Sequence, residues 1–121
     1  MMNNYWDIHN HILPGVDDGS SCLEETMLLI EEEYNQGVRN IIFTPHYRPN
    51  MFEVSCEDRQ EVFEEILPEI AEKYPDLNCY LGCELYLSEN SIENATKLGN
   101  RMNSTPIVLV EFNYGVAFAT P

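Results

Sequence analysis

The sequence is poor in basic residues. It has six lysines and arginines against 21 aspartates and glutamates in 121 residues, for a formal net charge of −15. Such an acidic chain gains nothing from counterion release on nucleic acid, and an anionic membrane surface repels it. Phosphorylated substrates are also repelled at long range, unless bound cations reverse the field locally. We therefore expect no nucleic-acid partner.

Long apolar runs and paired cysteines are absent as well. No run approaches the ~20 residues of a membrane span, and residues 1–6 lack the basic and apolar regions of a signal peptide. We expect no membrane insertion and a cytoplasmic location.

Four cysteines, at positions 22, 56, 79 and 83, do not form the Cys-x-x-Cys pairs of a zinc site. Free buried thiols in a reducing compartment are the simpler interpretation.

The chain is long enough for one domain, and 44% of its residues are apolar. Strand-like runs alternate with amphipathic helical patterns. Strands are expected at residues 5–8, 38–43, 77–83 and 107–110, and helices between a cap at Ser21 and Gly37, between a cap at Ser55 and Tyr74, and over 88–98. This βαβαβαβ order predicts an α/β fold with a parallel sheet. Pro68 is expected to kink the second helix or to end its first half.

Two of the three histidines, His9 and His11, are separated by a single residue after the first predicted strand. Alternation in extended chain sends both side chains to the same face. Pro14 and Gly15 then turn the chain, and a loop returns the carboxylates of Asp17 and Asp18. Imidazole and carboxylate together suit Zn, Mn or Fe. A strand-end histidine pair followed by a polar turn remains the alternative.

The ends of the later strands repeat this pattern, with His46, Glu84 and Glu111 each following an apolar run. Successive candidates lie roughly 30 to 40 residues apart, which is about one βα unit. Because the carboxyl ends of parallel strands converge on one site, these side chains are expected to meet. Singly, Glu84 and Glu111 are explained as solvated strand caps. The coincidence across four strands predicts a shared metal site.

Four motifs carry a resemblance to a known family: Asp-Ile-His-Asn-His-Ile-Leu-Pro-Gly-Val-Asp-Asp-Gly from Asp7, Thr-Pro-His to His46, Gly-Cys-Glu-Leu-Tyr around Glu84 and Val-Leu-Val-Glu-Phe around Glu111. Together they resemble the bacterial manganese-dependent protein-tyrosine phosphatases of the polymerase-and-histidinol-phosphatase (PHP) superfamily, which control capsule and exopolysaccharide synthesis. The Pro-Gly-x-Asp-Asp-Gly extension is specific to that branch. The resemblance covers residues 5–114.

The resemblance implies a site and a chemistry. The implied metal ligands are His9, His11, Asp18, His46, Glu84 and Glu111. Glu84 would bridge two ions of a multinuclear divalent cluster, usually Mn²⁺, that hydrolyses phosphomonoesters. The sequence does not separate Asp17 from Asp18 as ligand or proton carrier, and position favours Asp18 as the ligand. Arg48, the one basic residue placed near the site, is expected to contact phosphate. The implied substrate and partner is a tyrosine-phosphorylated protein such as a bacterial tyrosine autokinase.

The resemblance also implies a single partial domain over residues 1–121, about half of a distorted (β/α)7 barrel. The remaining ligands and the phosphate-holding arginines would lie beyond residue 121. We therefore expect an impaired or inactive chain: a truncated gene product, a homo-oligomer that pairs two halves, or a partner of a separate C-terminal half. A half barrel should leave the side chains of Ile42 and Leu109 partly exposed to solvent. The alternatives are a non-catalytic metal-binding or interaction fragment, and a PHP phosphatase for a small phosphomonoester such as histidinol phosphate.

Overall fold

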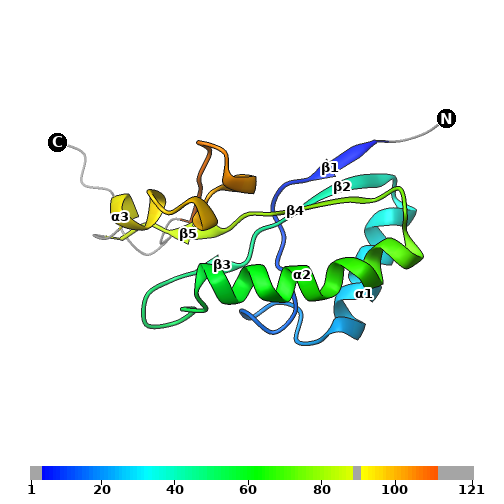
Figure 1. The fold of residues 1–121 in the computed structure, drawn as a ribbon, viewed down its shortest axis with the longest axis horizontal. Coiled ribbons are helices and arrows are strands. Elements are labelled where there is room, and N and C mark those ends of the chain that lie inside the picture. Colours follow the sequence, from blue (N-terminus) through cyan, green and yellow to red (C-terminus); the bar gives the residue numbers. More distant parts are fainter. Residues whose placement is uncertain (1–3, 89–90, 112–121) are drawn as a thin grey trace.

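Six short strands form two parallel three-stranded sheets in the computed structural model, which describes residues 4–88 and 91–111 (Figure 1). The first sheet has the order β1-β2-β4 and contains Tyr5–Asp7, Val38–Phe43 and Asn78–Leu81. The second has the order β3-β5-β6 and contains His46–Tyr47, Glu84–Tyr86 and Leu109–Glu111. All four strand pairs are parallel. The predicted α/β fold with parallel strands is confirmed.

Helices connect the strands. They are α1 (Leu23–Asn35), α2 (Cys56–Lys73) and the short α3 (Ser91–Ala95), followed by the 3₁₀ turns η1 (Leu98–Asn100) and η2 (Met102–Ser104). Within residues 4–88 and 91–111, none of the helices combines the length and the apolar character that crossing a bilayer would require. Residues 112–121, including Phe112 of the last motif, lie outside the described residues.

The division into two sheets corrects the single sheet expected from the sequence. The strand predicted at residues 38–43 is confirmed as β2, and Thr44 and Pro45 separate it from β3. The strand predicted at 77–83 ends at Leu81, and Gly82 and Cys83 separate it from β5. Proline has no N–H to donate to a strand ladder. Pairing resumes on the far side of the break, where the Glu84 N–H donates to the Pro45 carbonyl at 2.9 Å. Glu84 therefore begins β5 instead of following a strand, and Glu111 ends β6 instead of lying just beyond it.

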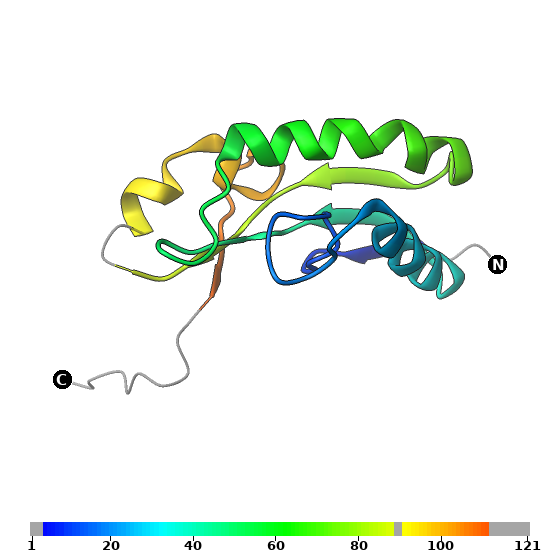
Figure 2. The same ribbon diagram turned by 90° about the horizontal axis from the view of Figure 1, so that it is seen from below.

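The hydrophobic core lies between the first sheet and the two long helices, which cover the same face of it (Figure 1). Figure 2 shows α2 running along β4, while α1 lies beside β2. Ile41 and Phe43 of β2 are fully buried there against Ile30 of α1 and Phe63 of α2. The Phe43 and Phe63 rings meet edge to face at 5.8 Å.

The opposite face of the first sheet is partly open. Trp6 is 54% exposed and stacks on Tyr80 with ring centroids 5.7 Å apart. These rings and Ile42 form one side of an apolar groove of about 200 Å³, which Met102 and Ile107 close on the other side. Ile42 and Leu109 are both only partly buried, as expected.

The helix ends follow the predicted chemistry in two of three cases. Ser55 caps α2 by accepting the Asp58 N–H at 3.1 Å, and Gly37, at φ 100°, follows the end of α1. The prediction that Ser21 caps α1 is wrong by one residue. Cys22 occupies the N-cap position, because the Ser21 hydroxyl donates to the Glu25 carboxylate instead of accepting a backbone N–H.

Pro68 does not end the second helix, since α2 continues to Lys73. A proline inside a helix costs about 3 kcal/mol. Phe63, Ile66 and Ile70 lie on both sides of the proline and are buried in the core. Their packing outweighs the lost backbone hydrogen bond.

The pH dependence of stability should reveal the interaction between the carboxyl groups of Asp7 and Glu33. Burial, a hydrogen bond with Asp7 and the charge of Asp7 raise the pKa of Glu33 to about 8 from the model-peptide value of 4.5. The folded protein therefore keeps a proton that the unfolded chain loses. The stabilisation is fully present below pH 4.5 and is lost as the pH rises to 8.

We expect Glu33→Gln to remove this loss. At pH 8 the variant should exceed the parent in free energy of unfolding by about 1 kcal/mol, after discounting for the solvent that reaches this half-buried group. Urea denaturation at pH 5 and pH 8 measures it, with the exposed Glu31→Gln as the matched control. An unchanged pH profile in Glu33→Gln would contradict the assignment.

Candidate metal centre

His9 and His11 follow β1, as predicted, although the strand ends at Asp7, one residue earlier than expected. Asn10 between them is buried and anchored to the end of β2. Its N–H donates to Thr44 Oγ1 at 2.8 Å and its side-chain amide donates to the Ile42 carbonyl at 2.9 Å. Because Asn10 faces β2, the flanking histidines project the other way. Their Nε2 atoms lie 2.9 Å and 3.0 Å from the same oxygen, Glu84 Oε1.

The loop after His11 folds back onto it. The Ser20 N–H donates to the His11 carbonyl at 3.0 Å. Gly19 approaches so closely that a Cβ there would lie 2.0 Å from the His11 carbonyl oxygen, so only glycine fits. This return brings the Asp17 carboxylate beside the His11 ring, with Oδ2 3.3 Å from Nδ1.

Asp17 and His11 perturb each other's protonation. Burial alone would raise the pKa of Asp17, but hydrogen bonds with the His11 ring and from the backbone N–H groups of His46 and Gly19 outweigh it and hold that pKa below its usual value. The hydrogen bond to Asp17 raises the pKa of His11 against the opposing effect of burial. The two groups form a charge-assisted pair at the edge of the site.

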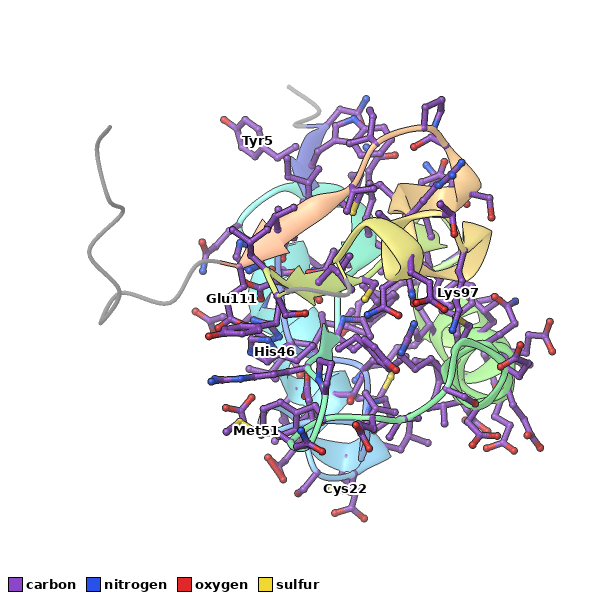
Figure 3. The ribbon with its side chains drawn as sticks, turned by 90° about the vertical axis from the view of Figure 1, so that its left-hand side faces the viewer. Tyr5, Cys22, His46, Met51, Lys97 and Glu111 are labelled. Carbon is purple, nitrogen blue, oxygen red and sulfur yellow. The ribbon has the colours of Figure 1, made fainter. Side chains whose placement is uncertain are left out.

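A second group of donors surrounds Glu84 from the other sheet. His46 pairs with Glu84 in the β3–β5 register, and His46 Nδ1 lies 3.5 Å from Glu84 Oε1 and 3.4 Å from Glu111 Oε1. Figure 3 shows His46 and Glu111 next to each other on one side of the molecule. The His46 ring also stacks on that of His11 at 4.1 Å. One glutamate thus joins both groups of ligands.

The donors fit a divalent metal cluster. His9, His11 and Glu84 form one group, and His46, Glu84 and Glu111 form another, each with ligand atoms within 4.8 Å of one another. His46 Nδ1 and Glu111 Oε1 are buried, yet neither has a hydrogen-bond partner within the part of the chain that the structure describes. Such atoms are costly to leave unpaired. A cation between them would satisfy both, and the nitrogen and oxygen donors suit Zn, Mn or Fe.

The other predicted residues lie at the rim. Asp18 is exposed over 64% of its side chain, and its Oδ1 lies 3.7 Å from His46 Nε2. The Arg48 guanidinium lies 4.0 Å over the Tyr86 ring. Phe52, from the loop after β3, stacks on the His46 ring at 5.4 Å.

Sequence reasoning did not assign Tyr86 or Phe52 to the site. Tyr86 was detectable, because it follows Glu84 by two residues and so shares its side of the strand. Phe52 was not, because its place depends on the tight turn in which its N–H donates to the Arg48 carbonyl at 2.9 Å.

The fold and this arrangement define an α/β protein with a candidate multinuclear metal centre at the junction of two parallel sheets. The family model described as capsular polysaccharide synthesis, CpsB/CapC, matches residues 5–120. The chain belongs to this family.

Relatives of known name extend the comparison. The tyrosine-protein phosphatase CpsB of Streptococcus agalactiae serotype V is 39% identical over 108 residues, which are 88% of this chain and 44% of that protein. CpsB of Streptococcus pneumoniae is 35% identical over 113 residues, 93% of this chain and 46% of that protein. The chain thus spans less than half the length of these relatives.

A solved structure shares the fold. It comes from work on YwqE of Bacillus subtilis and CpsB of Streptococcus pneumoniae, described as unique metal-dependent tyrosine phosphatases. It matches with a TM-score of 0.80 and 25% identity over 91% of this chain and 45% of that chain.

The shared glutamate should govern metal uptake. We expect Glu84→Gln to weaken Mn²⁺ binding by more than about 100-fold, because the change removes a charged donor from both groups at once, whereas an outer partner typically costs 10- to 100-fold. Titration calorimetry of the metal-free protein measures the affinity. Glu69→Gln, on the exposed side of α2, is the matched control. Equal affinities in the two variants would argue against a centre built on Glu84.

Proposed function

We propose that this chain carries the metal-holding part of a phosphomonoesterase that acts on protein phosphotyrosine in the control of capsule or exopolysaccharide synthesis. The observation that carries the proposal is the buried Glu84 carboxylate, with three imidazoles within 3.5 Å and Glu111 in contact with one of them. The names of the relatives, tyrosine-protein phosphatases CpsB and YwqE, support the substrate class. Mn²⁺ as the metal and a bacterial tyrosine autokinase as the substrate are parts of this proposal.

The candidate ligands fall into groups according to their positions in the site. His9, His11 and Glu84 would hold one cation, and His46, Glu84 and Glu111 a second on the Nδ1 side of His46. Asp18 lies on the other side of the His46 ring, 3.7 Å from Nε2, where it would contact a further cation. When bound, such cations supply the positive charge that this acidic chain lacks and make water a usable nucleophile near neutral pH. The burial of Glu84 and His46 excludes bulk water from one side of the centre, which strengthens its electrostatics.

Arg48 is placed to receive the anionic part of a substrate. Its guanidinium lies over the ring of Tyr86, which belongs to the strand that begins with Glu84. An arginine held in this way offers a fork of N–H donors that matches phosphate. We propose that Arg48 contacts the phosphoryl group and that the neighbouring aromatic rings border the phenyl ring of the substrate.

A second candidate is a metal-binding or interaction module without turnover. The chain corresponds to less than half of each phosphatase that it matches, so binding and catalysis need separate tests. A homo-oligomer, or a separate chain that supplies the other half, would restore turnover under this view. The cytoplasmic location stays a prediction.

Hydrolysis of p-nitrophenyl phosphate separates the two functions. With Mn²⁺ we expect a rate that chelation abolishes and that Glu84→Gln lowers at least 100-fold, in line with the loss of metal binding. Glu69→Gln should retain the parent rate. Stoichiometric Mn²⁺ uptake without hydrolysis at any protein concentration would favour the module. A preference for histidinol phosphate over a phosphotyrosine peptide would favour the small-substrate phosphatase.

Arg48→Ala tests the phosphate contact. Removing a charge-assisted hydrogen bond should weaken the binding of a phosphotyrosine peptide to the Mn²⁺-loaded protein by about 10-fold or more. Fluorescence polarisation measures the affinity. Arg101→Ala is the control, because the Arg101 side chain bonds to the carbonyls of Ala95 and Thr96 away from the centre. Equal affinities in the two variants would remove Arg48 from the substrate site.

A further inference from the structure

We propose that Asp17 is a positioning residue for the metal centre, which orients the His11 ring and ties it to the backbone of His46. The inference rests on the metal-binding part of the proposed function. It separates two adjacent acids that the sequence left interchangeable, Asp17 and Asp18.

Asp17 is surrounded by donors from three places in the site. Its side chain is fully buried. Oδ1 accepts the Gly19 N–H at 2.9 Å. Oδ2 accepts the His46 N–H at 2.9 Å and lies 3.3 Å from His11 Nδ1. Both oxygens are therefore engaged, and a fully buried carboxylate in this position is poorly placed to be a ligand or to exchange protons with solvent.

The contact with His11 decides which ring nitrogen is free. An ionised carboxylate can only accept, so the hydrogen bond with Asp17 requires a neutral His11 ring to carry its proton on Nδ1. The lone pair then lies on Nε2, the nitrogen that is 3.0 Å from Glu84 Oε1. Ligating histidines are commonly held in this way by a carboxylate on their other nitrogen.

The contact with His46 links two distant parts of the chain. His46 begins β3, directly after the break at Pro45, and its N–H is satisfied by Asp17 Oδ2. One carboxylate oxygen thus meets both ligand segments, and the His11 and His46 rings stack beside it. Asp17 fixes the spacing of the two imidazoles before any cation arrives.

Asp18 differs in each respect. Its side chain is mostly exposed and approaches the other nitrogen of His46, Nε2, at 3.7 Å. Because a cation held at His46 Nδ1 would lie on the opposite side of the ring, this position suits a ligand to a further cation on the Nε2 side. The two acids can therefore be separated by readouts that respond to ring orientation and to metal affinity.

The first test needs no substitution. In the metal-free protein, at a pH where the histidines are neutral, ¹⁵N-edited NMR reports the tautomer of each ring. We expect His11 to carry its proton on Nδ1. Finding it on Nε2 would overturn the proposal, whether or not the protein binds Mn²⁺.

The second test compares variants. Asp17→Ala should lower Mn²⁺ affinity by about 10- to 100-fold and shift the His11 tautomer towards Nε2–H, while Asp17→Asn, which keeps one acceptor oxygen, should fall between it and the parent. Asp18→Ala should weaken Mn²⁺ binding and leave the His11 tautomer unchanged. Asp76→Ala, at the exposed Arg39 ion pair, is the matched control and should change neither.

The outcomes are distinct. A folded Asp17→Ala variant with the parent's affinity and tautomer would overturn the proposal. If Asp17→Ala does not fold, the tautomer in the parent protein decides. A parent that takes up no Mn²⁺ would count against the proposed function, while the NMR result would still judge the role of Asp17.

Discussion

A single buried carboxylate holds the site together. Glu84 is only 6% exposed, and one of its oxygens has the nitrogens of His9, His11 and His46 at 2.9 to 3.5 Å. A charge in this environment is costly unless it is paired or binds a metal. The break at Gly82 and Cys83 places it at the start of β5, where it faces both sheets. The loop that carries Asp17 and the strand that carries Glu111 are arranged around that position.

The candidate metal ligands meet at the junction between the two sheets. Strand β2 and its successor β3 are separated by Thr44 and Pro45, and the chain bends there without losing its pairing to the next segment. Thr44 Oγ1 accepts from the Asn10 N–H and donates to the Asn10 carbonyl, so the same bend also positions the first two histidines. The register is the same on both sides of the break, because Phe43 pairs with Leu81 before it and His46 pairs with Glu84 after it. The pairing between these two chain segments therefore places His46 beside Glu84.

Net charge and site chemistry are complementary in this protein. A chain of net charge −15 repels a phosphate ester at long range. Two carboxylates among the three imidazoles favour cation binding over direct anion binding. The apolar groove beside Trp6 and Tyr80 is lined by none of the candidate metal ligands, so it is separate from the metal centre.

The sequence alone determined the α/β class, the extent of β2 and the set of candidate ligands, because apolar periodicity and the His-x-His and Asp-Asp-Gly spacing are local properties. It also gave a good account of the Ser55 cap, which depends on residues three apart. Only the tertiary structure decided that the strands at Pro45 and Gly82 divide into two sheets, that packing carries α2 through Pro68, and that Phe52 stacks on His46. It alone distinguished the buried Asp17 from the exposed Asp18. Those outcomes depend on contacts between segments far apart in the chain, and no pattern of neighbouring residues encodes which of two adjacent carboxylates a distant backbone N–H will meet.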